Sequence, residues 1–156
     1  MDWKALRWLW VLLQIVGAAG CATASLTRTY EQEAAAATTY PLPAKSILPR
    51  LEELLSSQGY SWTGSPATPC WKTVWRCRGS ICDRLIVTLV VSPSGTKVEI
   101  DRLTQEGGSD DAFVHQSAAG DIEWALYEKL DPEGARHAAA QARERAERES
   151  PCGTTP

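Results

Sequence analysis

Two neighbouring stretches typical of β-strands constrain the fold of this chain more than any other feature. Residues 84–91 (R-L-I-V-T-L-V-V) are apolar on both faces, which is typical of a strand in the centre of a sheet. After a Ser-Pro-Ser-Gly turn at residues 92–95, residues 97–103 alternate polar and apolar side chains, as a half-exposed strand does. The two stretches therefore predict consecutive antiparallel strands, the first of them central.

A third strand is predicted over residues 71–77 (W-K-T-V-W-R-C). Strand periodicity of two places Trp71 and Trp75 on one face, together with Thr73. The two tryptophans are therefore expected either to fill the core together or to form an exposed aromatic stripe together. Such a stripe would bind a partner protein or a glycan.

Two segments have helical periodicity. The first has apolar residues on one face at Ile47, Leu48, Leu51, Leu54 and Leu55. Pro49 is tolerated in the first turn of a helix, so this helix begins either with Ser46 as N-cap or at Pro43 with a kink. Gly59 is suited to the left-handed conformation that ends a helix. The second segment has apolar residues four apart at Ile122, Leu126 and Leu130.

These elements predict an α+β domain over residues 40–131. We expect an antiparallel meander of three to four strands covered by an N-terminal and a C-terminal helix, an arrangement called helix-grip or TBP-like. Residues 132–149 follow, rich in Ala, Arg and Glu, with Asp131 as N-cap and Pro132 in the first turn. With only alanines to bury, this segment is expected to be a solvated helix, and residues 150–156 a tail.

The N-terminal segment has the three-part plan of a secretory signal. Lys4 and Arg7 supply positive charge, residues 8–16 are apolar apart from Gln14, and residues 17–20 are small. The apolar stretch is shorter than the roughly 20 residues that span a bilayer. We therefore expect residues 1–20 to be a cleaved signal peptide, and residues 21–39 to be a flexible tether.

The run Ala18-Ala19-Gly20-Cys21 resembles the lipobox of bacterial lipoproteins. The resemblance implies cleavage before Cys21 and acylation of that residue, whose acyl chains would anchor the protein to a membrane. Ala22, next to Cys21, implies an outer-membrane address on the periplasmic side. The alternatives are a plain signal peptide cut after Ala19 or Gly20, with a secreted product in which Cys21 joins a disulfide, and an uncleaved anchor.

The predicted domain also resembles two groups of envelope lipoproteins. Its first helix, with Tyr40-Pro41, Ile47-Leu48-Pro49 and Gly59-Tyr60, is similar to the start of the repeated domain in the C-subunit lipoprotein of the outer-membrane β-barrel assembly machinery. The segment from Asp121 to Glu133 resembles small lipoproteins of high-GC Gram-negative bacteria. These resemblances imply a fold and an envelope address, and no catalytic residues.

Four cysteines follow Cys21, and an exported chain passes through an oxidising compartment where thiols pair. Cys77 and Cys82 flank a four-residue loop, Arg78 to Ile81, that would place them opposite each other on paired strands. We therefore predict a Cys77–Cys82 disulfide and, by elimination, a Cys70–Cys152 disulfide. The spacing lacks the close cysteine pairs of structural zinc sites, so no metal is expected.

Little else in the sequence indicates chemistry. His115 has Asp110, Asp111 and Ser117 nearby in sequence, but no nucleophile motif accompanies them. The net charge of −3 argues against nucleic-acid binding. We therefore expect a non-catalytic binding or scaffolding module without a cofactor, its partners a membrane and an envelope protein or glycan. The alternatives are a secreted, disulfide-stapled inhibitor or binding module, and a lipid-anchored hydrolase.

Overall fold

The computed structural model describes residues 23–63, 70–106 and 114–149. The chain divides into two compact units. One unit, Gln32–Ala135, contains the entire described sheet. The other combines Met1–Glu31 with Arg136–Pro156. The sheet unit includes the predicted domain of residues 40–131 and extends it at both ends.

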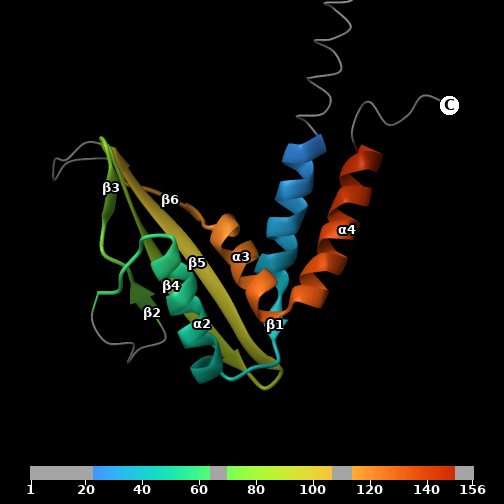
Figure 1. The fold of residues 1–156 in the computed structure, drawn as a ribbon, viewed down its shortest axis with the longest axis horizontal. Coiled ribbons are helices and arrows are strands. Elements are labelled where there is room, and N and C mark those ends of the chain that lie inside the picture. The colour runs from blue at the N-terminus through green and yellow to red at the C-terminus, as the bar shows by residue number, and fades with distance from the viewer. Residues whose placement is uncertain (1–22, 64–69, 107–113, 150–156) are drawn as a thin grey trace, which may run out of the picture. The chain divides into compact units, whose positions relative to one another are not determined.

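A six-stranded antiparallel sheet is the main element of the sheet unit (Figure 1). Its strands are β1 (Thr39–Tyr40), β2 (Cys70–Lys72), β3 (Arg76–Arg78), β4 (Ile81–Ser92), β5 (Gly95–Glu106) and β6 (Val114–Ala118). The two long strands, β4 and β5, form a hairpin that pairs over its whole length. β2 and β3 pair with β4 on its side away from β5, and β1 and β6 pair with β5 on its side away from β4. The predicted α+β class is confirmed, and short edge strands raise the strand number above the expected three or four.

Two helices, α2 (Ala44–Ser57) and α3 (Gly120–Leu130), cover one face of this sheet, which we call the inner face (Figure 1). The fully buried aliphatic side chains of the core come from the inner face and from these helices: Leu85, Val87, Ile100, Ile47, Leu51, Leu55, Ile122 and Leu126. Because these helical residues follow a spacing of three to four, one side of each helix is apolar and packs on the sheet. The other face of the sheet is called the outer face below.

Helix α2 begins at Ala44, directly after Pro43, and not with Ser46 as N-cap. Pro49 therefore lies inside the helix, where it has no N–H to donate to the preceding turn. Burial of the apolar side offsets this loss. The helix ends at Ser57, and Gly59, two residues on, has the predicted left-handed conformation with a φ of 82°, which glycine adopts without strain.

Residues 23–37 form an α-helix, so the prediction of a flexible tether over 21–39 is wrong for these residues. The alanine run at 34–37 has high helix propensity and is part of this helix, which ends directly before Thr38. The Thr38 hydroxyl donates a hydrogen bond of 2.8 Å to the Ala34 carbonyl in the last turn.

Helix α4 (Pro132–Glu149) has the predicted bounds but is not solvated on every side. Ala142 and Ala146 are buried. In the same unit, the Arg145 guanidinium lies 3.8 Å from the Tyr30 ring centroid, and the Tyr30 hydroxyl donates a hydrogen bond to Glu149. Small alanine side chains therefore serve as packing contacts here, because helices approach closely at such residues.

None of the helices that the structure describes combines the length and the apolar character of a membrane span. Residues 1–22 lie outside the described residues. The signal peptide and acylation at Cys21 therefore stay predictions.

Candidate binding surface

The strand predicted over residues 71–77 is interrupted by a β-bulge. Trp71 lies opposite Val87, whereas Arg76 lies opposite Asp83. The first strand thus advances by five residues while β4 advances by four, and the extra residue falls at Val74 and Trp75. Thr73 closes the ladder before the bulge, since its N–H donates to the Leu85 carbonyl (3.0 Å) and its hydroxyl accepts from the Leu85 N–H (2.9 Å).

The bulge sends the two tryptophans to opposite faces of the sheet. Trp71 is 8% exposed on the inner face and contacts Trp62 edge-to-face, with ring centroids 6.0 Å apart. Trp75 is half-buried beside Arg84, whose guanidinium lies 4.7 Å from its ring centroid. The prediction that Trp71 and Trp75 share a face is therefore wrong, because one inserted residue reverses the alternation.

This split predicts unequal costs of truncation. Trp71→Ala is expected to destabilise the protein by about 3–5 kcal/mol, because it removes a buried aromatic side chain and leaves a cavity. Trp75→Ala loses mainly a partly exposed cation–π contact, worth about 0.5–1 kcal/mol. Urea unfolding of the two variants measures the difference. Equal losses would contradict the bulge.

The outer face carries apolar, polar and charged side chains. They are Thr39, Cys70, Lys72, Trp75, Cys77, Cys82, Arg84, Ile86, Thr88, Val90, Lys97, Glu99, Asp101, Leu103, Gln105, Val114, Gln116 and Ala118. None of these side chains is buried, so no described element packs on this face.

The centre of the outer face is apolar and its surroundings are charged. Leu103 lies opposite Arg84, and Ile86 lies opposite Asp101, so Leu103 and Ile86 are diagonal neighbours on adjacent strands. Trp75 adjoins Arg84 on the other side. The arrangement gives an apolar centre with flanking charges of both signs.

The predicted disulfide Cys77–Cys82 is present at one end of the outer face. The two cysteines are paired residues of β3 and β4, with Cα atoms 3.9 Å apart. Gly79, with a φ of 64°, allows the tight connection between the strands. Cys70 is exposed on β2, whereas Cys152 lies outside the described residues, so the Cys70–Cys152 pairing stays a prediction.

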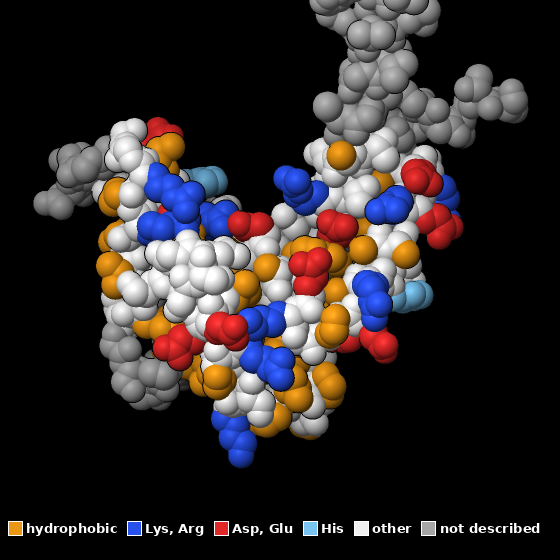
Figure 2. Space-filling view, viewed as in Figure 1, with side chains coloured by type: hydrophobic (Ala, Val, Ile, Leu, Met, Phe, Trp, Pro, Cys, Tyr) orange, Lys and Arg blue, Asp and Glu red, His pale blue; other side chains and the backbone are white. Residues whose placement is uncertain are grey.

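A cluster of charged side chains occupies the inner face at the β3 end of the sheet (Figure 2). Arg76 donates to both carboxylate oxygens of Asp83, at 3.0 and 2.9 Å, and to the Gln58 carbonyl after α2. The Tyr60 hydroxyl donates to the same carboxylate. Burial alone would raise the pKa of Asp83, but the hydrogen bonds from Arg76 and Tyr60 outweigh it and hold the pKa below its usual value. These bonds tie the end of α2 to the sheet.

A second ion pair joins the sheet to α3. Arg102 on β5 donates to both carboxylate oxygens of Asp121, at 3.0 and 2.8 Å. Neither ion pair was predicted from the sequence. Arg102 and Asp121 lie 19 residues apart on different elements. Arg76 and Asp83 are only 7 residues apart, and the strand pairing predicted for Cys77 and Cys82 already places them opposite each other. Arg76 binds Asp83 in a bidentate manner through two guanidinium nitrogens, whereas Arg102 contacts both oxygens of Asp121 through Nη2 alone. Both pairs join separate elements of the sheet unit and therefore serve the fold.

Glu123 fills a gap along the edge of β5, between β1 and β6. Its Oε1 accepts the Ile100 N–H at 2.9 Å, while the Ala119 N–H donates to the Ile100 carbonyl at 2.7 Å. The Oε2 atom is buried and has no hydrogen-bond partner in the described chain. Burial therefore raises the pKa of Glu123 above its usual 4.5.

The buried Glu123 predicts a specific pH dependence of stability. Because its pKa is higher in the folded state, its favourable contribution is complete below about 4.5 and is lost as the pH rises through the folded-state value. On β5, the positive charge of Lys97 lowers the pKa of Glu123, whereas the negative charges of Asp101 and Glu99 raise it. Glu123 in turn raises the pKa of Tyr40 on β1. The variant Glu123→Gln keeps an acceptor for Ile100 but has no charge.

Melting temperatures of the parent and Glu123→Gln are therefore expected to converge at pH 4 and to diverge above it. The variant should be the more stable protein at pH 8. Glu128→Gln, at an exposed position of the same helix, is the control and should follow the parent. A variant that melts below the parent at pH 8 would contradict the buried carboxylate.

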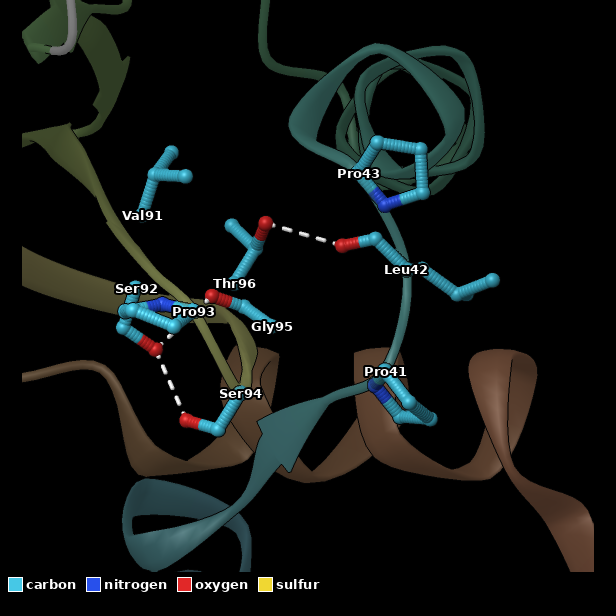
Figure 3. Close-up of a pocket in the computed structure, with 9 residues that line it drawn as sticks. All are labelled: Pro41, Leu42, Pro43, Val91, Ser92, Pro93, Ser94, Gly95 and Thr96. Atoms are coloured by element: carbon cyan, nitrogen blue, oxygen red, sulfur yellow. Dashed lines mark hydrogen bonds between the residues drawn. The ribbon is translucent and has the colours of Figure 1, made fainter.

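A shallow pocket of about 430 Å³ lies where the β4–β5 turn meets the segment before α2 (Figure 3). Its lining residues are Pro41, Leu42, Pro43, Val91, Ser92, Pro93, Ser94, Gly95 and Thr96. The Thr96 hydroxyl donates to the Leu42 carbonyl at 2.8 Å across it. The lining contains no titratable side chain, and it therefore offers a ligand van der Waals contacts and uncharged hydrogen-bonding groups only.

His115, which no nucleophile motif accompanies in the sequence, does not line this pocket. His115 and Ser117 are exposed on the inner-face side of β6, and Asp110 and Asp111 lie outside the described residues. Among the residues that the structure describes, no three His, Cys, Asp or Glu side chains are grouped as metal ligands would be.

Comparisons with protein-family models, curated proteins and solved structures gave no match.

Proposed function

We propose that this chain is a lipid-anchored module of the bacterial cell envelope that binds another envelope protein through its outer face. The proposal includes no catalytic step. The observation that carries it is the outer face itself, on which none of the side chains is buried and whose centre is apolar.

The proposed anchor rests on the sequence that precedes the sheet unit. Ala18-Ala19-Gly20-Cys21 resembles a lipobox, and acyl chains on Cys21 would hold the protein at a membrane. A signal for export and a site for acylation together favour a protein that stays in the cell envelope over one that is released into the medium. The same binding face on a secreted protein is the alternative that the acylation test in the Discussion separates.

The composition of the outer face is the composition of a protein interface. Such interfaces have an apolar centre, aromatic and arginine side chains near it, and a polar rim. Ile86 and Leu103 are the centre here, Trp75 and Arg84 are beside them, and Lys72 and Asp101 adjoin Ile86 on the two neighbouring strands.

The aromatic side chains favour a protein partner over a glycan. Sugar binding needs aromatic rings with open faces, whereas Trp71 is buried and the guanidinium of Arg84 lies over the ring of Trp75. An arginine held against a tryptophan is pre-positioned to donate to a carboxylate or a carbonyl. We therefore propose a partner that offers acidic and apolar groups side by side.

Site-specific photo-crosslinking in the intact envelope tests the proposed surface. A photoreactive amino acid replaces Leu103 or Ile86 on the outer face, or Glu52 on the exposed side of α2 as a control. We expect one protein adduct of the same mass from both outer-face positions and none from the control. The Arg84→Ala variant should reduce the adduct yield about tenfold, as loss of a contact at the centre of an interface does.

Two results would overturn the proposed surface. One is equal adduct formation from Glu52 and Leu103, and the other is formation only of adducts with glycan. An adduct yield that is unchanged in Arg84→Ala would show that Arg84 does not contribute to binding of the partner.

A further inference from the structure

Strand β6 forms an edge of the sheet that differs from the other edges. It pairs with β5 on one side and, among the described strands, with none on the other. All five of its residues are exposed, and Val114 is 49% exposed. An edge of this kind presents unpaired backbone groups to any extended strand that approaches it.

The hydrogen-bond pattern identifies which backbone groups point outward. The Ala119 N–H donates to the Ile100 carbonyl and the Ile100 N–H donates to Glu123, so both backbone groups of Ile100 point toward the β6 side of β5. Ile100 and Ala119 therefore occupy a position of the antiparallel ladder at which the backbone groups of the two strands face each other. Such pairs alternate with pairs whose groups point away. In the register of β5 and β6, the outward N–H and C=O groups therefore belong to Val114, Gln116 and Ala118.

The β6 edge also has none of the usual protection against strand pairing. Proteins protect edges with lysine, proline, charged side chains or very short strands. β1 has two residues, β2 contains Lys72, and β3 contains Arg76 and Arg78. β6 reads V-H-Q-S-A, without proline, lysine, arginine or an acidic residue.

We infer that β6 pairs antiparallel with β6 of a second copy of this chain, about a two-fold axis at Gln116. The outward groups lie symmetrically about this residue, so Val114 of one copy bonds Ala118 of the other and Gln116 bonds Gln116. This register uses every outward N–H and C=O of both strands. The two sheets then join into one continuous sheet.

The side chains fit the same register. Val114 lies beside Ala118 of the second copy, which covers an exposed apolar side chain with a small one. His115 lies beside Ser117 of the second copy, and no like charges are opposed. Because a five-residue ladder is a small interface, we expect a dissociation constant on the order of micromolar.

Oxidative cross-linking of the full chain in lipid vesicles tests this register. Gln116→Cys should give a covalent dimer, because directly opposed residues of hydrogen-bonded strands are about 5.5 Å apart at Cα. Val114→Cys should give about tenfold less, because its counterpart in the second copy is roughly 13 Å away along the strand. Mass spectrometry of the linked peptide identifies the bond, and the parent chain gives the background.

A second pair of variants separates strand pairing from chance collision. The double variant Val114→Cys with Ala118→Cys should cross-link, since these residues are opposed in the dimer. Adding Gln116→Pro should abolish the dimer, because proline removes a central outward N–H and leaves the β5–β6 bonds intact. Adding Gln116→Ala should leave the dimer unchanged.

Three results would overturn the inference. They are cross-linking of Gln116→Cys at the level of the parent, equal cross-linking of Gln116→Cys and Val114→Cys, and a dimer that persists with Gln116→Pro. None of them bears on the outer-face partner, which is tested from β4 and β5.

Discussion

Leu51→Asp is expected to unfold the sheet unit at room temperature. Leu51 is completely buried between α2 and the inner face of the sheet. An unpaired carboxylate there costs several kcal/mol, which is comparable to the total stability of about 5–15 kcal/mol of a small domain. Circular dichroism of the variant should show loss of the cooperative thermal transition.

Glu52→Lys is the matched control, because Glu52 is the next residue of α2 and is exposed. Surface substitutions of this kind change stability by about 0.5 kcal/mol or less. Leu51→Ala should fall between the two, with a loss of about 2–5 kcal/mol. Parent-like melting of Leu51→Asp would mean that α2 presents a different side to the sheet.

The elements predicted correctly are those whose signal is local. The hairpin of β4 and β5 follows from two adjacent stretches and the turn between them, and the Cys77–Cys82 disulfide follows from the short loop that brings the cysteines together. The apolar side of α2 follows from spacing within one helix. In each case the residues that pack together lie within about one element's length, so periodicity alone predicts their relation.

The bulge at Val74 and Trp75 could not be read from alternation, because alternation is what the bulge breaks. Without it, the ladder that begins at Cys77 and Cys82 would place Trp71 opposite Thr88, on the outer face. Burial of a large aromatic side chain with Val87 favours the shifted register. This gain in burial competes with regular pairing. It depends on contacts with a second strand, so the sequence of residues 71–77 alone does not reveal it.

The remaining site features depend on contacts between distant segments. Glu123 reaches the Ile100 N–H only because β1 and β6 leave a gap along β5. Strand β6 itself was not predicted, because V-H-Q-S-A is short and mostly polar. Its strand conformation comes from pairing with β5 rather than from intrinsic propensity.

The second large effect concerns the anchor. Cys21→Ala is expected to abolish acylation completely, because the thioether can form only on the cysteine sulfur. Loss of the acyl chains removes the membrane attachment, since each buried CH₂ contributes about 0.8 kcal/mol. Cys21 lies outside the sheet unit, Gln32–Ala135, so the melting temperature of that unit should not move.

Metabolic labelling with a palmitate analogue in a Gram-negative host, followed by detergent phase partitioning, measures this effect and tests the envelope function most directly. The parent chain and the control Cys70→Ala should be labelled and should enter the detergent phase. Cys21→Ala should be unlabelled. A parent chain that is unlabelled and stays in the aqueous phase, or a label that persists in Cys21→Ala, would contradict the lipid-anchored account.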